Sequence, residues 1–78
     1  MSRREKLRKK MLAIPEKIRF AEVDALLRYE GFVLFNSRGS RRTYHREDGR
    51  VLTVVKPPAK RRTCNPADIR RILEALER

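Results

Sequence analysis

Apolar residues recur at three- and four-residue spacing in two stretches of the chain. The first stretch covers residues 20–29 and is followed by Gly31, which suits the end of a helix because glycine adopts a left-handed backbone without strain. The second covers residues 69–76 and follows Asn65 and Pro66, residue types that favour the cap and the first turn of a helix. The pattern predicts two amphipathic helices.

The segment between these helices has a different pattern, with β-branched and aromatic residues grouped at residues 32–36, 41–46 and 51–55. Residues 37–40 contain a glycine-serine pair that suits a hairpin loop, and residues 47–50 contain an Asp-Gly pair typical of a two-residue turn. The three runs predict an antiparallel meander.

Proline marks two further boundaries. Pro15 ends a basic amino-terminal segment, for which we predict a short helix within residues 1–14. We predict a partial apolar stripe on this helix, formed by Leu7, Met11, Leu12 and Ile14. Pro57 and Pro58 end the third strand because proline lacks the N–H that a strand ladder needs, so residues 56–64 are expected to form an exposed connection.

We expect one domain over residues 1–78, since a chain of this length has room for one modest core. The expected fold class is α+β in the order α-β-β-β-α, with residues 18–77 as the core and the basic helix of residues 1–14 as an addition. Both amphipathic helices can bury their apolar stripes on one face of the antiparallel sheet. The other face is then free for a ligand.

The charge of the chain narrows the class of its partner. Its 21 Lys and Arg residues exceed its 10 Asp and Glu residues, giving a net charge of +11, which indicates a polyanion such as nucleic acid. Cys64 is the only cysteine, so an internal disulfide is excluded, and neither a metal site nor a cofactor is expected. We find no apolar run long enough for a membrane span and no export signal, so we expect a cytoplasmic protein without a membrane partner.

The basic residues concentrate in the hairpins and in the connection that follows them. Because guanidinium groups pair with phosphates in a two-pronged geometry, this concentration predicts a surface that binds RNA. The alternative is a set of charges that protects exposed strand edges. The predicted RNA-binding residues are Arg38, Ser40, Arg41, Arg42, Arg46, Lys56, Lys60, Arg61 and Arg62.

Strand alternation assigns the residues of the second strand to two faces of the sheet. His45, the only histidine, shares a face with Arg41 and Thr43, and Tyr44 shares the opposite face with Arg42. His45 is a candidate acid or base, and the alternative is an exposed strand histidine without a catalytic role. Tyr44 is expected to pack in the core, with stacking on an unpaired base as the alternative.

Several of these features together resemble the HicA family of toxins. The resemblance spans residues 7–76 and is carried by the run Leu-Leu-Arg-Tyr-Glu-Gly-Phe-Val-Leu at residues 26–34, by Gly39 and Ser40, and by Tyr44 four residues later. The resemblance implies a fold like that of the double-stranded-RNA-binding domain. It also implies an endoribonuclease that cleaves messenger RNA without a metal, and an acidic HicB-like antitoxin as partner.

The chain departs from the family pattern at the catalytic position. The family has a histidine that assists proton transfer at the 2′-hydroxyl just after the Gly-Ser pair, whereas this chain has Arg41 and Arg42 there. A guanidinium stays protonated and cannot act as a base, but it can stabilise charge in the transition state. Catalysis is therefore expected to rest on Arg41, Arg42 and His45 together. The alternatives are a non-catalytic RNA-binding module of the same fold and an interaction protein whose basic surface holds an acidic partner chain.

Overall fold

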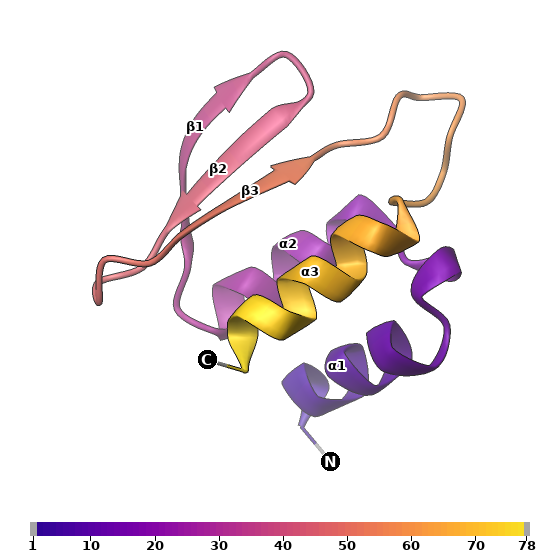
Figure 1. The fold of residues 1–78 in the computed structure, drawn as a ribbon, viewed down its shortest axis with the longest axis horizontal. Coiled ribbons are helices and arrows are strands. Elements are labelled where there is room, and N and C mark those ends of the chain that lie inside the picture. Colours follow the sequence, from indigo (N-terminus) through magenta and orange to yellow (C-terminus); the bar gives the residue numbers. More distant parts are fainter. Residues whose placement is uncertain (1, 78) are drawn as a thin grey trace.

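The computed structural model describes residues 2–77 and confirms the predicted α+β order. A basic helix and one turn of 3-10 helix precede a helix, three strands and a final helix (Figure 1). The elements are α1 (Arg3–Ala13), η1 (Pro15–Lys17), α2 (Phe20–Tyr29), β1 (Val33–Arg38), β2 (Arg41–His45), β3 (Val51–Val55) and α3 (Pro66–Leu76). The third strand has the predicted bounds, whereas the first extends through residue 38.

Local capping explains where two of the helices begin. At the start of α1, the hydroxyl of Ser2 accepts a hydrogen bond from the backbone N–H of Glu5 at 3.2 Å. At the start of α3, the side chain of Asn65 accepts one from the N–H of Ala67 at 2.9 Å. Each cap satisfies a donor that has no partner within its own helix.

The strands form one antiparallel sheet in the order β1-β2-β3, with β1 and β3 at its edges. Leu34, Tyr44 and Leu52 are in register on the face that packs against the helices. We call the other side the open face. Its residues, by register and alternation, are Val33, Asn36, Arg38, Arg41, Thr43, His45, Val51, Thr53 and Val55.

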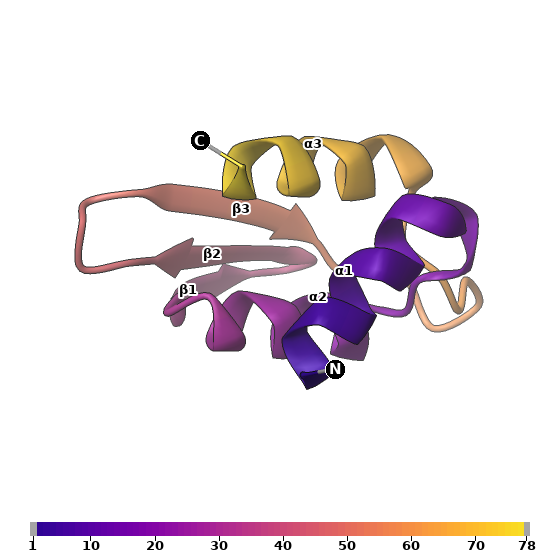
Figure 2. The same ribbon diagram turned by 90° about the horizontal axis from the view of Figure 1, so that it is seen from below.

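The elements form three layers. α2 and α3 both lie on one face of the sheet, as predicted, and α1 lies on the far side of these two helices (Figures 1 and 2). α1 contacts both α2 and α3. No element within residues 2–77 covers the open face, where the side chains of Val33 and Val51 are 65% and 53% exposed.

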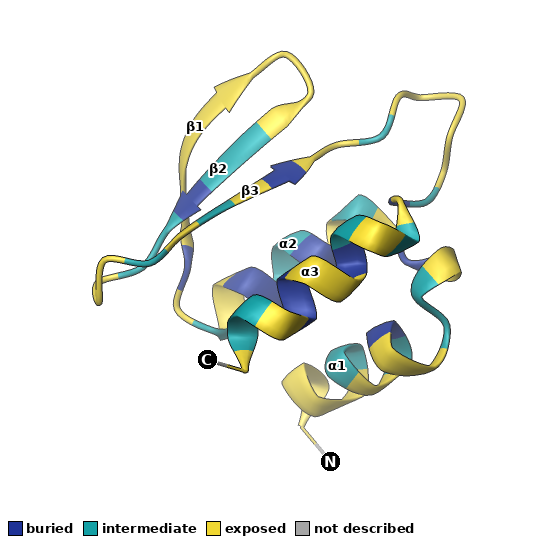
Figure 3. Ribbon diagram, viewed as in Figure 1, coloured by how far each residue is buried: buried dark blue, intermediate teal, exposed yellow. Residues whose placement is uncertain are grey.

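The core lies between the sheet and the two covering helices and extends to α1 (Figure 3). Its largest fully buried side chains are Tyr44, Met11, Ile18, Leu26, Leu27, Ile69, Val23 and Val54. Met11 is the buried residue of α1, whereas the next residue, Leu12, is 63% exposed. Placing Leu12 in the same apolar stripe was wrong, because consecutive helical residues point about 100° apart.

Tyr44 packs in the core, as expected. Its side chain has no exposed surface, and its hydroxyl donates a hydrogen bond to the carboxylate of Asp24 on α2 at 2.6 Å. Burial raises the pKa of Tyr44, and the hydrogen bond to Asp24 raises it further. The bond joins the middle strand to a covering helix, so the orientation of β2 relative to α2 is fixed by a polar contact as well as by packing.

The hairpins differ from their predicted forms. Between β1 and β2 the turn consists only of Gly39 and Ser40, with Gly39 at a φ of +54°, which is the requirement of a type II′ turn. Between β2 and β3, the N–H of Arg46 donates to the carbonyl of Arg50 at 3.0 Å, so three residues form the loop where two were predicted. Within the described chain only glycines have positive φ, so the Asp-Gly pair does not form the predicted two-residue turn.

The connection after β3 is exposed for most of its length but ends in the core. Cys64 is 2% exposed, and its N–H donates to the carbonyl of Ile18 at 2.7 Å. Burial is the main cause that raises the pKa of the Cys64 thiol. The prediction of an exposed connection throughout residues 56–64 was therefore wrong at its last residue, where the chain must return to the helix layer before α3 begins.

Candidate functional site

One end of the sheet carries three cationic residues in close succession. Arg38 and Arg41 are in register across the β1–β2 turn, and both lie on the open face. The carbonyl of Ser40 accepts the N–H of Lys56 at 2.6 Å, which joins the turn to the end of β3. We call this group of Arg38, Arg41 and Lys56 the basic end of the sheet.

The cations of the basic end are available to a ligand. Within residues 2–77, neither Arg38 nor Arg41 has a hydrogen bond or ion pair to its guanidinium, and both residues are exposed. The ammonium group of Lys56 lies 5.9 Å from the ring centre of Phe20 and is also exposed. Lys60, Arg61 and Arg62 extend the positive charge along the exposed connection. Residues 49–67 contain no acidic side chain, so the positive potential here is not offset locally.

Arg42 lies on the other face of β2 and has a structural contact. Arg42 is half-buried as a residue, and its guanidinium donates to the carbonyl of Gly39 at 2.5 Å and to that of Arg41 at 3.3 Å. These bonds fold the side chain back over the β1–β2 turn. Arg42 is therefore held away from the open face on which Arg41 and His45 lie.

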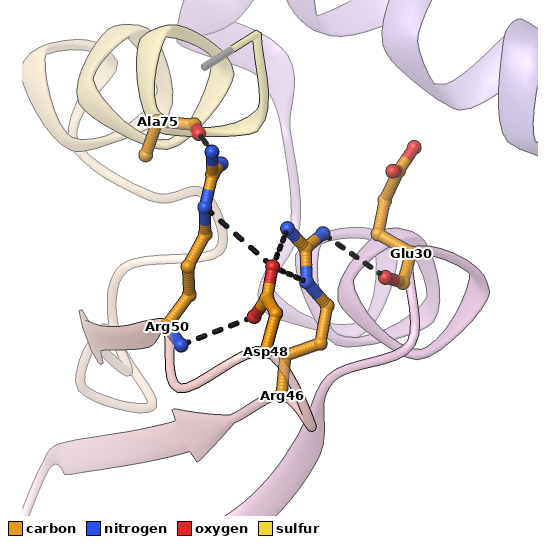
Figure 4. Close-up of polar contacts among 5 residues, drawn as sticks. All are labelled: Glu30, Arg46, Asp48, Arg50 and Ala75. Atoms are coloured by element: carbon orange, nitrogen blue, oxygen red, sulfur yellow. Dashed lines mark hydrogen bonds and ion pairs between the residues drawn. The ribbon is translucent and has the colours of Figure 1, made fainter.

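Arg46 is also engaged within the protein. Its guanidinium binds the carboxylate of Asp48 through two nitrogens, at 2.6 and 3.0 Å, and donates to the carbonyl of Glu30 at the end of α2 at 3.4 Å (Figure 4). It lies 4.9 Å from the ring centre of Phe32. Arg50 also binds Asp48 and donates to the carbonyl of Ala75 in α3 at 2.9 Å. Asp48 thus holds two arginines at the carboxyl ends of two helices, where positive charge is favoured.

The sequence did not predict this network, and Arg46 is among the residues that it assigns to an RNA-binding surface. The sequence signal was an Asp-Gly turn with an arginine on each side of it. The network sets the loop conformation, because Asp48 also accepts the backbone N–H of Arg50 at 3.1 Å. The hydrogen bonds from Arg46 are the main cause that lowers the pKa of Asp48, to about 2.

Replacing Asp48 by asparagine is expected to make stability less sensitive to acid. A carboxylate with a depressed pKa contributes stability above its unfolded pKa of about 4 and loses it as the pH falls toward its folded value. The gap in unfolding free energy between wild type and Asp48→Asn should therefore be largest above about pH 4 and shrink toward pH 2. Urea denaturation across this range measures it. Glu47→Gln serves as a neighbouring control, and a gap for Asp48→Asn that does not change with pH would contradict the account.

His45 lies on the open face at the opposite end of β2 from Arg41. Its ring is stacked on that of Phe35, with ring centres 3.9 Å apart and an angle of 9° between the planes. His45 also lines an open pocket of about 650 Å³ together with Gly31, Val33, Arg46 and Glu47. The sequence does not single out Glu47, because no motif distinguishes it. The pocket is thus lined by a histidine and a glutamate, two residue types whose side chains can carry protons.

The structure does not bring the three predicted catalytic residues together. Arg41 and His45 share the open face, but four residues of extended strand separate their backbones by about 13 Å. Arg42 faces the other way and binds the carbonyl of Gly39. The arrangement therefore consists of a cationic end, formed by Arg38, Arg41 and Lys56, and a separate pocket that contains His45.

Two other kinds of feature, a metal site and a membrane-spanning helix, were sought in the described part of the chain. Residues 2–77 contain no group of three or more His, Cys, Asp or Glu side chains placed to hold a metal ion. Among the described helices, none has the length and apolar character that crossing a membrane requires.

Comparison with known proteins identifies one matching family. The sequence model of one protein family, described as the HicA toxin of bacterial toxin-antitoxin systems, matches residues 20–77. The match covers α2, the sheet and α3, and it begins after α1. No curated protein and no solved structure matches the chain.

Proposed function

The chain belongs to the HicA toxin family of bacterial toxin-antitoxin systems, and on this premise we propose that it binds messenger RNA and cleaves it without a metal. The family implies an antitoxin partner. In our proposal this partner is an acidic HicB-like chain, since the net charge of +11 favours a negatively charged protein surface. Messenger RNA as substrate places the proposed activity in the cytoplasm.

The observation that carries RNA binding is the pair of unpartnered guanidinium groups at the basic end. Arg38 and Arg41 are exposed on one face. The backbone of Lys56 is bonded to Ser40 in the adjacent turn, and its ammonium group lies toward Phe20 on α2. Cations without an internal partner can neutralise phosphates, and the release of counterions then favours binding. Lys60, Arg61 and Arg62 supply further phosphate contacts along the backbone of the RNA.

We assign the cleavage step to the pocket of His45. When the 2′-oxygen attacks phosphorus, a 2′,3′-cyclic phosphate forms and the bond from phosphorus to the 5′-oxygen breaks. One proton leaves the 2′-hydroxyl and one is delivered to the 5′-oxygen. His45 and Glu47 line the same pocket and can accept and donate these protons. Arg41 lies about 13 Å along the strand and holds a neighbouring phosphate in place.

A second candidate function is a non-catalytic RNA-binding module. The observation that favours it is the separation of Arg41 and His45 together with the inward-facing Arg42, because the residues at the family's histidine position do not lie in the pocket. In this case the protein acts by holding messenger RNA. Intact RNA that is retarded on a native gel in excess chelator would favour the module over the endoribonuclease.

Replacing Arg41 by alanine is expected to weaken RNA binding to a similar extent for all sequences. If Arg41 neutralises one phosphate, the slope of log affinity against log salt concentration should decrease in magnitude by about one. Fluorescence anisotropy of labelled single-stranded RNA over a series of salt concentrations measures this slope. The matched control is Arg70→Ala, since Arg70 is an exposed arginine on α3. Equal slopes for wild type and Arg41→Ala would remove the basic end from the proposed binding surface.

A further inference from the structure

An exposed aromatic side chain stands on the open face and has no role in the core. Phe35 is 67% exposed, and every residue of β1 is exposed. The register of β1 with β2 shifts between Leu34 and Asn36, so Phe35 is the extra residue of a β-bulge. Bulges redirect side chains and are frequent next to functional sites. A phenylalanine that contributes so little to the core calls for another explanation.

The rings of Phe35 and His45 form a two-membered stack. The centroid distance of 3.9 Å and the angle of 9° show that each ring covers one face of the other. β1 is an edge strand, so no neighbouring strand lies beyond Phe35 on its outer side. The outer face of the phenylalanine ring is therefore open for a third flat ring in the same stack.

We propose that the outer face of Phe35 is a stacking platform for an unpaired nucleobase of the bound RNA. The inference rests on the proposed RNA binding and deepens it by requiring a single-stranded substrate. Aromatic side chains stack on any base, whereas a base within a duplex has both of its faces covered. The stack places the nucleotide beside His45, and hence its ribose and phosphate beside the pocket.

Charge on the same face favours a nucleotide over a protein as occupant. Arg38 lies on β1 three residues from Phe35, and Arg41 is in register with Arg38. The residues that define the open face include no carboxylate. The face therefore combines an aromatic ring with cations that bind phosphate, which are the two components of single-strand recognition. The exposed side chains of Val33 and Val51 line the apolar part of the same surface.

The test measures affinities of the full chain for single-stranded RNA and for an RNA duplex of the same length by fluorescence anisotropy. Phe35→Leu keeps an apolar side chain but removes the aromatic face, and Phe35→Tyr restores a ring. We expect Phe35→Leu to lower the affinity for single-stranded RNA by about tenfold and to leave the affinity for the duplex unchanged. We expect Phe35→Tyr to bind both RNAs as wild type does. A 2-aminopurine base in the single strand should lose fluorescence on binding to wild type and retain it with Phe35→Leu.

The outcomes separate this inference from the proposed function. Single-stranded RNA that binds wild type and Phe35→Leu equally well, with the same fluorescence change, would overturn the stacking platform and leave RNA binding in place. The apolar surface would then be free for a protein partner. A wild-type protein that binds neither RNA would overturn the proposed function and the platform together. Equal losses for single-stranded and duplex RNA in Phe35→Leu would also overturn the platform, because a duplex offers no unpaired base.

Discussion

The His45→Ala variant is expected to lose nearly all cleavage of messenger RNA while retaining its affinity for RNA. Removal of a group that transfers protons in the transition state lowers the rate by about 10²- to 10⁴-fold. Affinity should change little, because the proposed phosphate contacts are at the basic end, at the other end of β2 from His45. Denaturing gels with labelled messenger RNA in excess chelator measure the rate, and anisotropy measures the affinity.

Two companion variants make the His45 result specific. Arg70→Ala changes an exposed residue of α3, outside the open face, and should cleave RNA as wild type does. Glu47→Gln keeps the size of the side chain but removes a proton carrier from the same pocket, so its rate should also fall. Cleavage by His45→Ala at the wild-type rate would exclude the pocket as the site of reaction. Loss of affinity in step with loss of cleavage would show that His45 acts by binding.

Truncation of Met11 to alanine is expected to destabilise the protein by about 2 to 5 kcal/mol. Met11 has no exposed surface and is the buried side chain of α1, so its removal leaves a cavity where α1 packs against the other helices. For a domain of this size, a loss of this magnitude is a large fraction of the total stability. Urea denaturation followed by circular dichroism measures the change in the free energy of unfolding.

The adjacent residue provides the control for Met11. Leu12 is 63% exposed, so Leu12→Ala removes a similar apolar volume from the surface and should change stability by less than about 0.5 kcal/mol. The comparison tests whether α1, which precedes the family match at residue 20, is part of the cooperative fold. Equal effects of the two variants would mean that α1 does not pack as the structure shows.

The arrangement of layers separates the basic helix from the open face. α1 lies beyond α2 and α3 (Figure 2). Arg4 and Arg8 of α1 lie 3.6 and 3.9 Å from the carboxylate of Glu30, the residue that follows α2. Lys10 forms an ion pair with Glu22 at 2.7 Å. The basic residues of α1 thus help to dock this helix on α2, so these positive charges contribute to packing within the protein.

The elements of the fold were predictable because their signals are local. The stripe of residues 69–76 and the cap at Asn65 define α3, and the run at residues 51–55 defines β3. The alternation of β2 correctly assigned Tyr44 and His45 to opposite faces, because a strand has a period of two whatever surrounds it.

The candidate site was less predictable because it depends on contacts between distant residues. The bulge at Phe35 is set by the register between two strands, and no local pattern indicates it. The sequence alone predicts that Arg46 and Arg50 are surface charges. Only the structure shows that they contact the ends of two helices. Glu47 becomes a candidate proton carrier only because it lines the same pocket as His45. Residue type alone therefore does not show which arginines already have partners within the protein.

The central claim, that RNA lies on the open face of the sheet, is tested most directly by nuclear magnetic resonance of the full chain. Amide signals would be followed during titration with single-stranded RNA whose 2′-hydroxyls are methylated, so that no nucleophile is present for cleavage. We predict that the largest changes occur at Phe35, Arg38, Arg41, His45 and Lys56, with little change along α1. Changes concentrated on α1, with the signals of β1 and β2 unmoved, would contradict the account.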